Sequence, residues 1–233
     1  MASKTPSNEP QGFDPIESLD LQQGLGKVEA FWEKNKQILS IAGGGILALI
    51  LGSYYIWGVY LPAQQKEAVN LMHVAERYFE NDSLTLAVKG DGNFPGFEEI
   101  ADDYGWTAAG NLAHYYLGVS YLRLGQYNEA LESLESFKTS DPVLGSIGLG
   151  CQGDAHLQLK KDSDALDCYL RAAEFKANEF TTPFYLQRAG EIAEKLGQKE
   201  KALSCYERIQ REYPQSTEGQ NVDRYLTRIR LKS

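Results

Sequence analysis

The sequence predicts an all-α protein in which a single N-terminal transmembrane helix precedes a solenoid of helical hairpins. Two observations lead to this fold class. Between Lys36 and Lys66 the chain carries no charged residue, and from residue 111 onward it repeats a helical pattern in units that begin near Asn111, Ser146 and Pro183. Supersecondary repeats of this length bury their apolar faces only by stacking on one another, and stacked units form a solenoid.

The uncharged stretch has the length of a membrane span. At a rise of about 1.5 Å per residue, a helix over residues 38–61 would cross a hydrocarbon core of about 30 Å. Aromatic residues lie near both ends, as in the two interfacial belts of a bilayer. A cleaved signal peptide is the competing interpretation, but the polar leader is too long and no small-residue cleavage site follows. We therefore assign residues 37–62 to an uncleaved transmembrane helix.

The lysines near the span favour one orientation. Lys27, Lys34 and Lys36 precede it, whereas only Lys66 follows within a comparable distance. Because basic residues are retained on the cytoplasmic side, we expect the N-terminus in the cytoplasm and the repeats outside it. In a bacterium this predicts a single-pass protein of the inner membrane with a periplasmic repeat domain. A cytoplasm-facing adaptor is the reverse alternative.

Three small residues of the span share one helix face. Gly44, Ala48 and Gly52 recur every four residues, and residues at that spacing lie above one another on a helix. Small side chains at this spacing allow a second helix to approach closely. We expect this face to contact a partner's membrane helix, although Gly and Ala are also common in spans without such a contact.

The segments on either side of the span are assigned from their composition. Residues 1–17 are polar and contain proline, which predicts a disordered cytoplasmic tail. Residues 18–36 are expected to form an amphipathic juxtamembrane helix, because apolar residues recur on one stripe: Leu21, Leu25, Val28 and Trp32. Residues 63–110 are expected to be a helical lead-in, with one helix over 64–79, an irregular stretch over 81–96 and a short helix over 97–103.

Residues 111–216 match the spelling of the tetratricopeptide repeat (TPR) in three units. The match is strong in the first and third units and weaker in the second. Glycines stand where the two helices of each unit are expected to cross, and alanines are expected to face them from the second helix: Gly118, Gly153 and Gly190, with Ala130, Ala165 and Ala202. Residues 217–233 keep an apolar stripe among charges, which predicts a polar capping helix that closes the solenoid.

The arrangement resembles the bacterial inner-membrane TPR proteins of the YfgM type, in a version similar to that of Bacteroidota. The likeness lies in the short tail, the single span and the repeat domain, and in phrases such as FWEKNKQIL before the span and NLAHYYLG in the first repeat. It extends over residues 25–215. The resemblance implies an accessory role at the Sec protein-conducting channel, alongside a membrane-anchored periplasmic chaperone, and it implies no catalytic residues.

The sequence contains no pattern that indicates catalysis. None of the common nucleophile, metal or phosphate-binding motifs is present. The three histidines are isolated and the three cysteines are widely spaced, so we expect neither a metal site nor a disulfide framework. The net charge of −9 argues against nucleic acid, because phosphate binding requires clustered Lys and Arg. We therefore predict a scaffold with no cofactor and no nucleic-acid partner, not an enzyme.

The predicted binding surface is the concave face of the solenoid, formed by residues of the first helices that do not pack inside their own unit. It begins apolar and aromatic and ends acidic, which suits a helix or an extended apolar segment rather than an anionic tail. Its predicted residues are Leu112, Tyr115, Val119, Leu122, Arg123, Ile147, Asp154, Leu157, Phe184, Gln187 and Glu191. The alternative, that this face is only solvated or is covered by the helices after the span, stays open.

Two scaffolding functions follow from these features. The first is an accessory subunit of the Sec export channel that binds partner proteins on its extracytoplasmic side. The second is a general periplasmic scaffold of another envelope or secretion complex. The identity of the bound partners distinguishes them.

Overall fold

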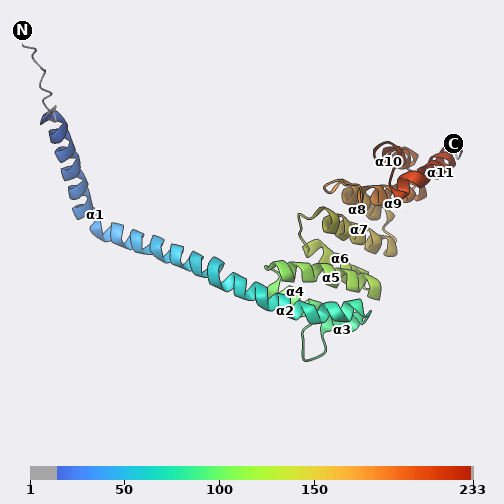
Figure 1. Ribbon diagram of the computed structural model, residues 1–233, viewed down its shortest axis with the longest axis horizontal. Helices are drawn as coiled ribbons and strands as arrows, with labels where there is room; N and C mark the ends of the chain where they lie inside the picture. The colour runs from blue at the N-terminus through green and yellow to red at the C-terminus, as the bar shows by residue number, and fades with distance from the viewer. Residues whose placement is uncertain (1–14, 232–233) are drawn as a thin grey trace, which may run out of the picture. The chain divides into compact units, whose positions relative to one another are not determined.

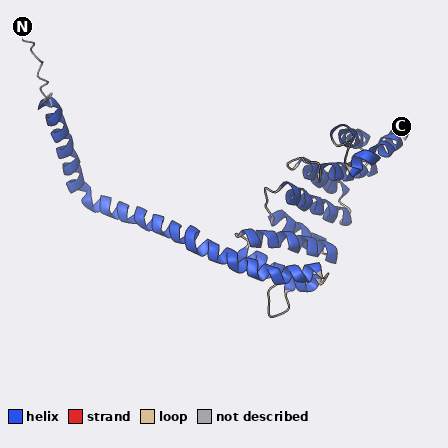
Figure 2. Ribbon diagram, viewed as in Figure 1, coloured by secondary structure: helices blue, strands red, loops and turns tan. Residues whose placement is uncertain are grey.

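The computed structural model describes residues 15–231, which are helical apart from short turns and loops and include no strand (Figures 1 and 2). The all-α fold class predicted from the sequence is therefore confirmed. The chain divides between Tyr60 and Leu61 into an N-terminal unit and a solenoid unit.

The N-terminal unit is one helical run. α1 extends over Pro15–Tyr55 and continues as a short π-helical segment, η1, over Ile56–Tyr60. The helix begins at Pro15 rather than at residue 18, because proline is favoured in the first turn of a helix. The earlier part of the predicted disordered tail lies outside the described residues, as do the side chains of Leu21, Leu25 and Val28.

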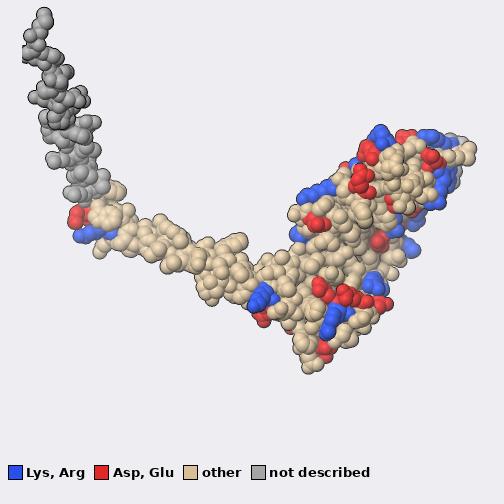
Figure 3. Space-filling model, in the orientation of Figure 1, with Lys and Arg blue, Asp and Glu red and all other residues tan. Residues whose placement is uncertain are grey.

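The apolar side chains of this helix are exposed. Ile41, Leu49 and Trp57 are 76%, 75% and 73% exposed, and no charged atom interrupts the apolar stretch in Figure 3. A segment within Ala30–Glu80 is long and apolar enough to cross a membrane, and none of it is buried. A core helix of the same composition would be buried, so this segment is a candidate membrane span.

The solenoid unit consists of ten helices among its described residues. They are α2 (Leu61–Glu80), α3 (Leu84–Lys89), α4 (Phe97–Tyr104), α5 (Ala108–Leu124), α6 (Tyr127–Ser136), α7 (Pro142–Gln158), α8 (Asp162–Glu174), α9 (Thr182–Lys195), α10 (Lys199–Glu212) and α11 (Thr217–Leu231). Each helix packs against the next, so that α5/α6, α7/α8 and α9/α10 form the three expected hairpins. Figure 1 shows these hairpins stacked in chain order.

The two helices of each hairpin meet at a glycine, as the repeat spelling predicts. A Cβ at any of the three crossing glycines would lie within 3 Å of a side chain on the second helix: Leu134 for Gly118, Tyr169 for Gly153 and Tyr206 for Gly190. The facing alanines, Ala130, Ala165 and Ala202, are fully buried. A side chain at the crossing would therefore force the helices apart.

The stretch predicted to be irregular contains a helix. α3 lies within residues 81–96 and buries Leu84, Ala87 and Val88. Its apolar residues follow the i, i+3, i+4 spacing of a helix, but the glycines and the proline that follow them concealed the pattern. The expectation of an irregular stretch over 81–96 is therefore wrong in its first half.

The junction between α4 and α5 repeats the geometry of the junction between α10 and α11. At the start of α5, the Thr107 hydroxyl donates to the Tyr104 carbonyl (2.8 Å) and accepts from the Gly110 amide (3.0 Å). At the start of α11 the equivalent bonds join Ser216 to Tyr213 and Gly219, at 2.9 Å each.

Aromatic rings stack at the same relative positions. Phe97 of α4 stacks on Tyr116 of α5, and Tyr206 of α10 stacks on Tyr225 of α11, with ring centroids 5.1 Å apart in both pairs. α4 therefore stands as the second helix of a pair that α2 opens, and α11 stands as the first helix of a further pair. The region described as a lead-in belongs to the repeat architecture.

Candidate protein-binding surface of the solenoid

α7 is the unusual helix of the solenoid, because aromatic rings from neighbouring elements lie against its glycines. A Cβ at Gly145 would overlap Phe175, and one at Gly150 would overlap Tyr185. Gly148 faces Phe137 more loosely, with 3.3 Å between the Cβ position and the ring. Because these glycines have no side chains, the neighbouring rings can approach α7 closely. Where no ring occupies the space beside a glycine, the surface of α7 is hollow.

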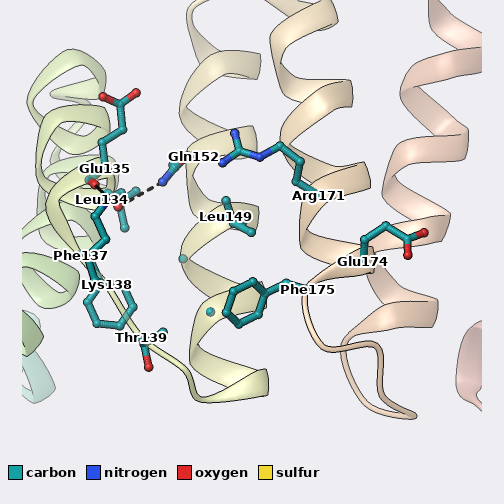
Figure 4. Close-up of a pocket in the computed structure, with 12 residues that line it drawn as sticks. Leu134, Glu135, Phe137, Lys138, Thr139, Leu149, Gln152, Arg171, Glu174 and Phe175 are labelled. Carbon is teal, nitrogen blue, oxygen red and sulfur yellow. Dashed lines mark hydrogen bonds between the residues drawn. The ribbon is translucent and has the colours of Figure 1, made fainter.

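A groove lies over this helix, between the C-terminal ends of α6 and α8 (Figure 4). Its volume is about 770 Å³. We call it the α7 groove, lined by Leu134, Glu135, Phe137, Lys138, Thr139, Gly145, Gly148, Leu149, Gln152, Arg171, Glu174 and Phe175. Its lining combines apolar and aromatic side chains with charged groups of both signs.

Several polar groups of the groove already have partners. The Gln152 side-chain amide donates to the Leu134 carbonyl at 3.1 Å (Figure 4). The Lys138 ammonium donates to the Glu135 carbonyl at 2.6 Å, and Glu174 is ion-paired with Arg208. Arg171 is more loosely held, since its guanidinium lies 3.9 Å from Asp167 and its side chain is 58% exposed.

The predicted residues of the first repeat pack mostly inside the solenoid. Leu112 and Leu122 lie against the core formed by α2 to α5. Tyr115 contacts Phe137, with ring centroids 5.4 Å apart, and burial raises the pKa of its hydroxyl to about 12. Val119 is half-buried. These four side chains therefore form a continuous surface with neighbouring helices rather than projecting freely.

Arg123 is the exposed member of that group. Its guanidinium pairs with the Asp82 carboxylate at 2.7 Å and lies over the Phe79 ring, 5.3 Å from the centroid. It joins the end of α5 to the turn after α2.

Asp154 of the second repeat belongs to a hydrogen-bonded network between repeats. Its carboxylate accepts from the Tyr169 hydroxyl at 2.6 Å and from the Arg188 guanidinium. Arg188 also donates to the Tyr169 oxygen at 2.7 Å. Burial is the main cause that raises the pKa of Tyr169, and the hydrogen bond to Asp154 adds to it. Asp154 therefore holds α7, α8 and α9 together before any ligand binds.

The other predicted residues divide between packing and exposure. Ile147 and Leu157 are half-buried, and Leu157 packs against the core of α8 to α11. Gln187 donates to both Glu191 and the Tyr225 hydroxyl, at 3.1 Å each. Phe184 is 44% exposed at the start of α9. The structure thus leaves Phe184 and Arg123 as the most accessible predicted residues.

The small-residue face of the span is open. A Cβ at Gly44 or Gly52 would meet nothing within 4 Å, and Ala48 is exposed. This is the geometry that a second helix would need in order to approach closely.

Two observations bear on metal binding and on thiol reactivity in the described part of the chain. Within residues 30–231, whose side chains the structure describes, no group of three or more His, Cys, Asp or Glu side chains could hold a metal ion. Burial raises the pKa of Cys151 to about 12 and those of Cys168 and Cys205 to about 11. Their thiols are therefore protonated at neutral pH and are poor nucleophiles.

Sequence reasoning missed the α7 groove and the network around Asp154. The signal for the groove was present, because Gly145, Gly148 and Gly150 are spaced so that they surround one helix. The rings that they face come from α6, α8 and α9 or from the loops beside them, and the sequence does not show which ring meets which glycine.

Comparison with known proteins agrees with this geometry. The family described as Tetratricopeptide repeat matches residues 112–142 and 185–216, the first and third expected units. The second unit is not matched, in agreement with its weaker similarity to the TPR consensus sequence. No curated protein matches the chain.

Solved structures show the same fold. MamA superposes with a TM-score of 0.50 at 16% identity, over 71% of this chain and 88% of MamA. A Podosopora anserina protein described as a kinesin light chain with nearly identical TPR-like repeats gives 0.53 at 14% identity, over 71% and 86%. A substituted variant of that protein gives 0.51 at 13%, over 72% and 95%. The chain thus contains tetratricopeptide repeats and folds as an all-helical TPR solenoid with one candidate membrane span near its N-terminus.

Proposed function

We propose that the protein is a membrane-anchored TPR scaffold, held by one span, which binds protein partners through its solenoid on the extracytoplasmic side of the bacterial inner membrane. The observation that carries the proposal is the direct succession of an exposed apolar helix and a TPR solenoid in one chain. TPR solenoids offer extended surfaces to helices and peptides. The lysines before the span support the orientation.

The partner that we propose is the Sec protein-conducting channel, together with a membrane-anchored periplasmic chaperone. The resemblance to YfgM-type proteins in the tail, the span and the repeat spelling supports this assignment. The alternative, a scaffold of another envelope or secretion complex, needs the same anchor and the same repeats. Only the identity of the bound proteins separates the two.

Two surfaces of the solenoid suit a partner. The α7 groove has a volume of about 770 Å³ and is lined by apolar and aromatic side chains as well as by Lys138 and Arg171. The predicted first-helix surface offers Phe184 as its exposed aromatic residue. Both fit an amphipathic helix or an extended apolar segment.

The test is site-specific photocrosslinking in native membranes. A photoreactive amino acid replaces Arg171 in the α7 groove, Phe184 on the first-helix surface, or exposed Lys201 on α10 as the control. Adducts with the same membrane or periplasmic protein at Arg171 or Phe184, and none at Lys201, would support the scaffold. Sec subunits among the adducts would favour the first assignment, and other envelope proteins the second. Equal adducts at all three positions, or none, would contradict it.

A further inference from the structure

The loops that join one helical pair to the next share one edge of the solenoid (Figure 1). We call this the inter-pair edge and define it by residues 105–107, 137–141, 175–181 and 213–216. The start of α2 lies at the same edge, because the Ala109 amide at the beginning of α5 donates to the Gln65 side chain at 3.2 Å. The solenoid therefore begins, at Leu61, on its inter-pair edge.

Large apolar side chains are exposed along this edge. Trp106 is 57% exposed and Phe180 is 82% exposed, both in loops of the edge. Val143 and Phe184, in the first turns of α7 and α9, are 38% and 44% exposed. An indole and a phenyl ring exposed to this extent at loop tips contribute little to the core and are free to contact another surface.

The turns inside the three TPR hairpins differ in composition from the inter-pair loops. The turns inside the hairpins, at residues 125–126, 159–161 and 196–198, carry Lys160 and Lys161 and no exposed large apolar side chain. Leu124, just before the first of these turns, is 39% exposed. The connection inside the first pair, over residues 81–96, does expose Leu86 (40%) and Phe94 (47%). The two most exposed aromatic side chains among the described residues of the solenoid, Phe180 and Trp106, lie on the inter-pair edge.

The charges of the inter-pair loops balance. Lys138 and Lys176 are matched by Asp141 and Glu179, in a chain whose net charge is −9. An acidic surface is repelled by the negative potential of anionic lipids. The inter-pair loops themselves do not share the acidic balance of the whole chain, although Asp102 and Asp103 precede Trp106 at the end of α4.

We propose that the inter-pair edge docks on the lipid headgroup region of the membrane that holds the span, with Trp106 and Phe180 inserted at the interface. The inference rests on the proposed anchoring. Aromatic rings prefer the interface between headgroups and acyl chains, and the chain enters the solenoid from the span at this same edge. A few rings would bind lipid weakly from solution, but the covalent tether makes their contact intramolecular and raises their effective concentration.

This docking would bring one of the candidate binding surfaces close to the bilayer. Phe137 begins one inter-pair loop and Phe175 begins the next, and both line the α7 groove. The groove therefore opens beside the edge that faces the headgroups. A juxtamembrane segment of a membrane protein would meet it there.

The experiment places one tryptophan at a time in the full chain, reconstituted in vesicles of phosphatidylcholine and phosphatidylglycerol. Replacing Trp32 and Trp57 by Phe leaves Trp106 alone. Further versions retain Trp57 alone, or carry Phe180→Trp or Leu124→Trp with all three native tryptophans replaced by Phe. Emission is compared between ordinary lipids and lipids brominated near the headgroup end of the acyl chain, which quench tryptophan on contact.

We expect Trp106 and the Phe180→Trp version to lose a share of their emission approaching that lost by Trp57, and the Leu124→Trp version to lose none. Quenching of Trp57 without quenching of Trp106 and the Phe180→Trp version would overturn the docking and leave the anchor standing. Equal quenching in the Leu124→Trp version would overturn it too, because the contact would not be specific to the edge. An unquenched Trp57 would refute the anchor and the docking together.

Discussion

Gly150 shows how single residues set the geometry of the solenoid. The position has ordinary helical backbone, so glycine is not needed for its conformational freedom. It is needed because the Tyr185 ring occupies the place of a Cβ. Tyr185 is 6% exposed and stacks on Tyr169 with ring centroids 6.2 Å apart, so it has little room to retreat.

Gly150→Ala is expected to destabilise the solenoid. Overpacking costs about 1–3 kcal/mol, which exceeds the helix-propensity gain of about 1 kcal/mol for replacing glycine by alanine. Urea denaturation followed by circular dichroism measures the change. The matched control is Gly148→Ala on the same helix, where Phe137 is half-buried and can give way. A Gly150→Ala protein as stable as the Gly148→Ala protein would refute the packing argument.

The cysteines give a residue-scale prediction that depends on pH. Burial raises the pKa of Cys151 to about 12, whereas an unfolded thiol titrates near about 8.5. The folded state therefore keeps the thiol proton up to a higher pH than the unfolded state does. The free energy of unfolding falls as the pH rises above the pKa of the unfolded thiol.

At pH 8 the folded protein should resist alkylation by iodoacetamide at Cys151, Cys168 and Cys205, and unfolding in urea should make all three reactive. Mass spectrometry of the labelled protein gives the count at each site. Rapid labelling of Cys168 or Cys205 in the folded state would mean that its thiol is accessible and that the burial seen here is absent in solution.

At the scale of elements, the repeat spelling predicted the hairpins because their determinants are local. A glycine and an alanine at fixed spacing define each crossing, and the apolar stripe of α11 marks its buried side, where Val222, Leu226 and Ile229 all lie in the core. The helix α3 was not predicted, because glycines and a proline follow its apolar residues closely in the sequence. The binding surface was predicted less well, since Asp154 and Tyr115 contact residues far from them in the sequence.

The span is the element whose role is easiest to separate from its anchoring. Gly44→Leu combined with Gly52→Leu keeps the helix apolar, so insertion should survive, while close approach of another helix would be lost. We expect a lower yield of partner protein after gentle solubilisation. The control is Ile46→Val with Leu49→Ile, which lie on the other side of the helix. Equal yields from the two pairs would show that the span is a plain tether.

At the scale of the whole molecule, the proposed protein is a membrane anchor joined to a binding solenoid, with the N-terminus and the solenoid on opposite sides of the bilayer. The solenoid has cores of its own among α2 to α5 and among α8 to α11, so its fold does not depend on the span. The fold could be predicted from periodicity and hydropathy. The side of the membrane on which the solenoid lies is predicted only from the larger number of lysines before the span than after it.

A topology measurement tests whether the solenoid lies outside the cytoplasm. Alkaline phosphatase, which folds to an active enzyme only after export, is fused after Ser233 of the full chain and produced in a bacterial host. The account predicts an active fusion in the membrane fraction, with the same enzyme fused directly before the span inactive. An inactive fusion after Ser233 would place the solenoid in the cytoplasm and contradict the proposed function.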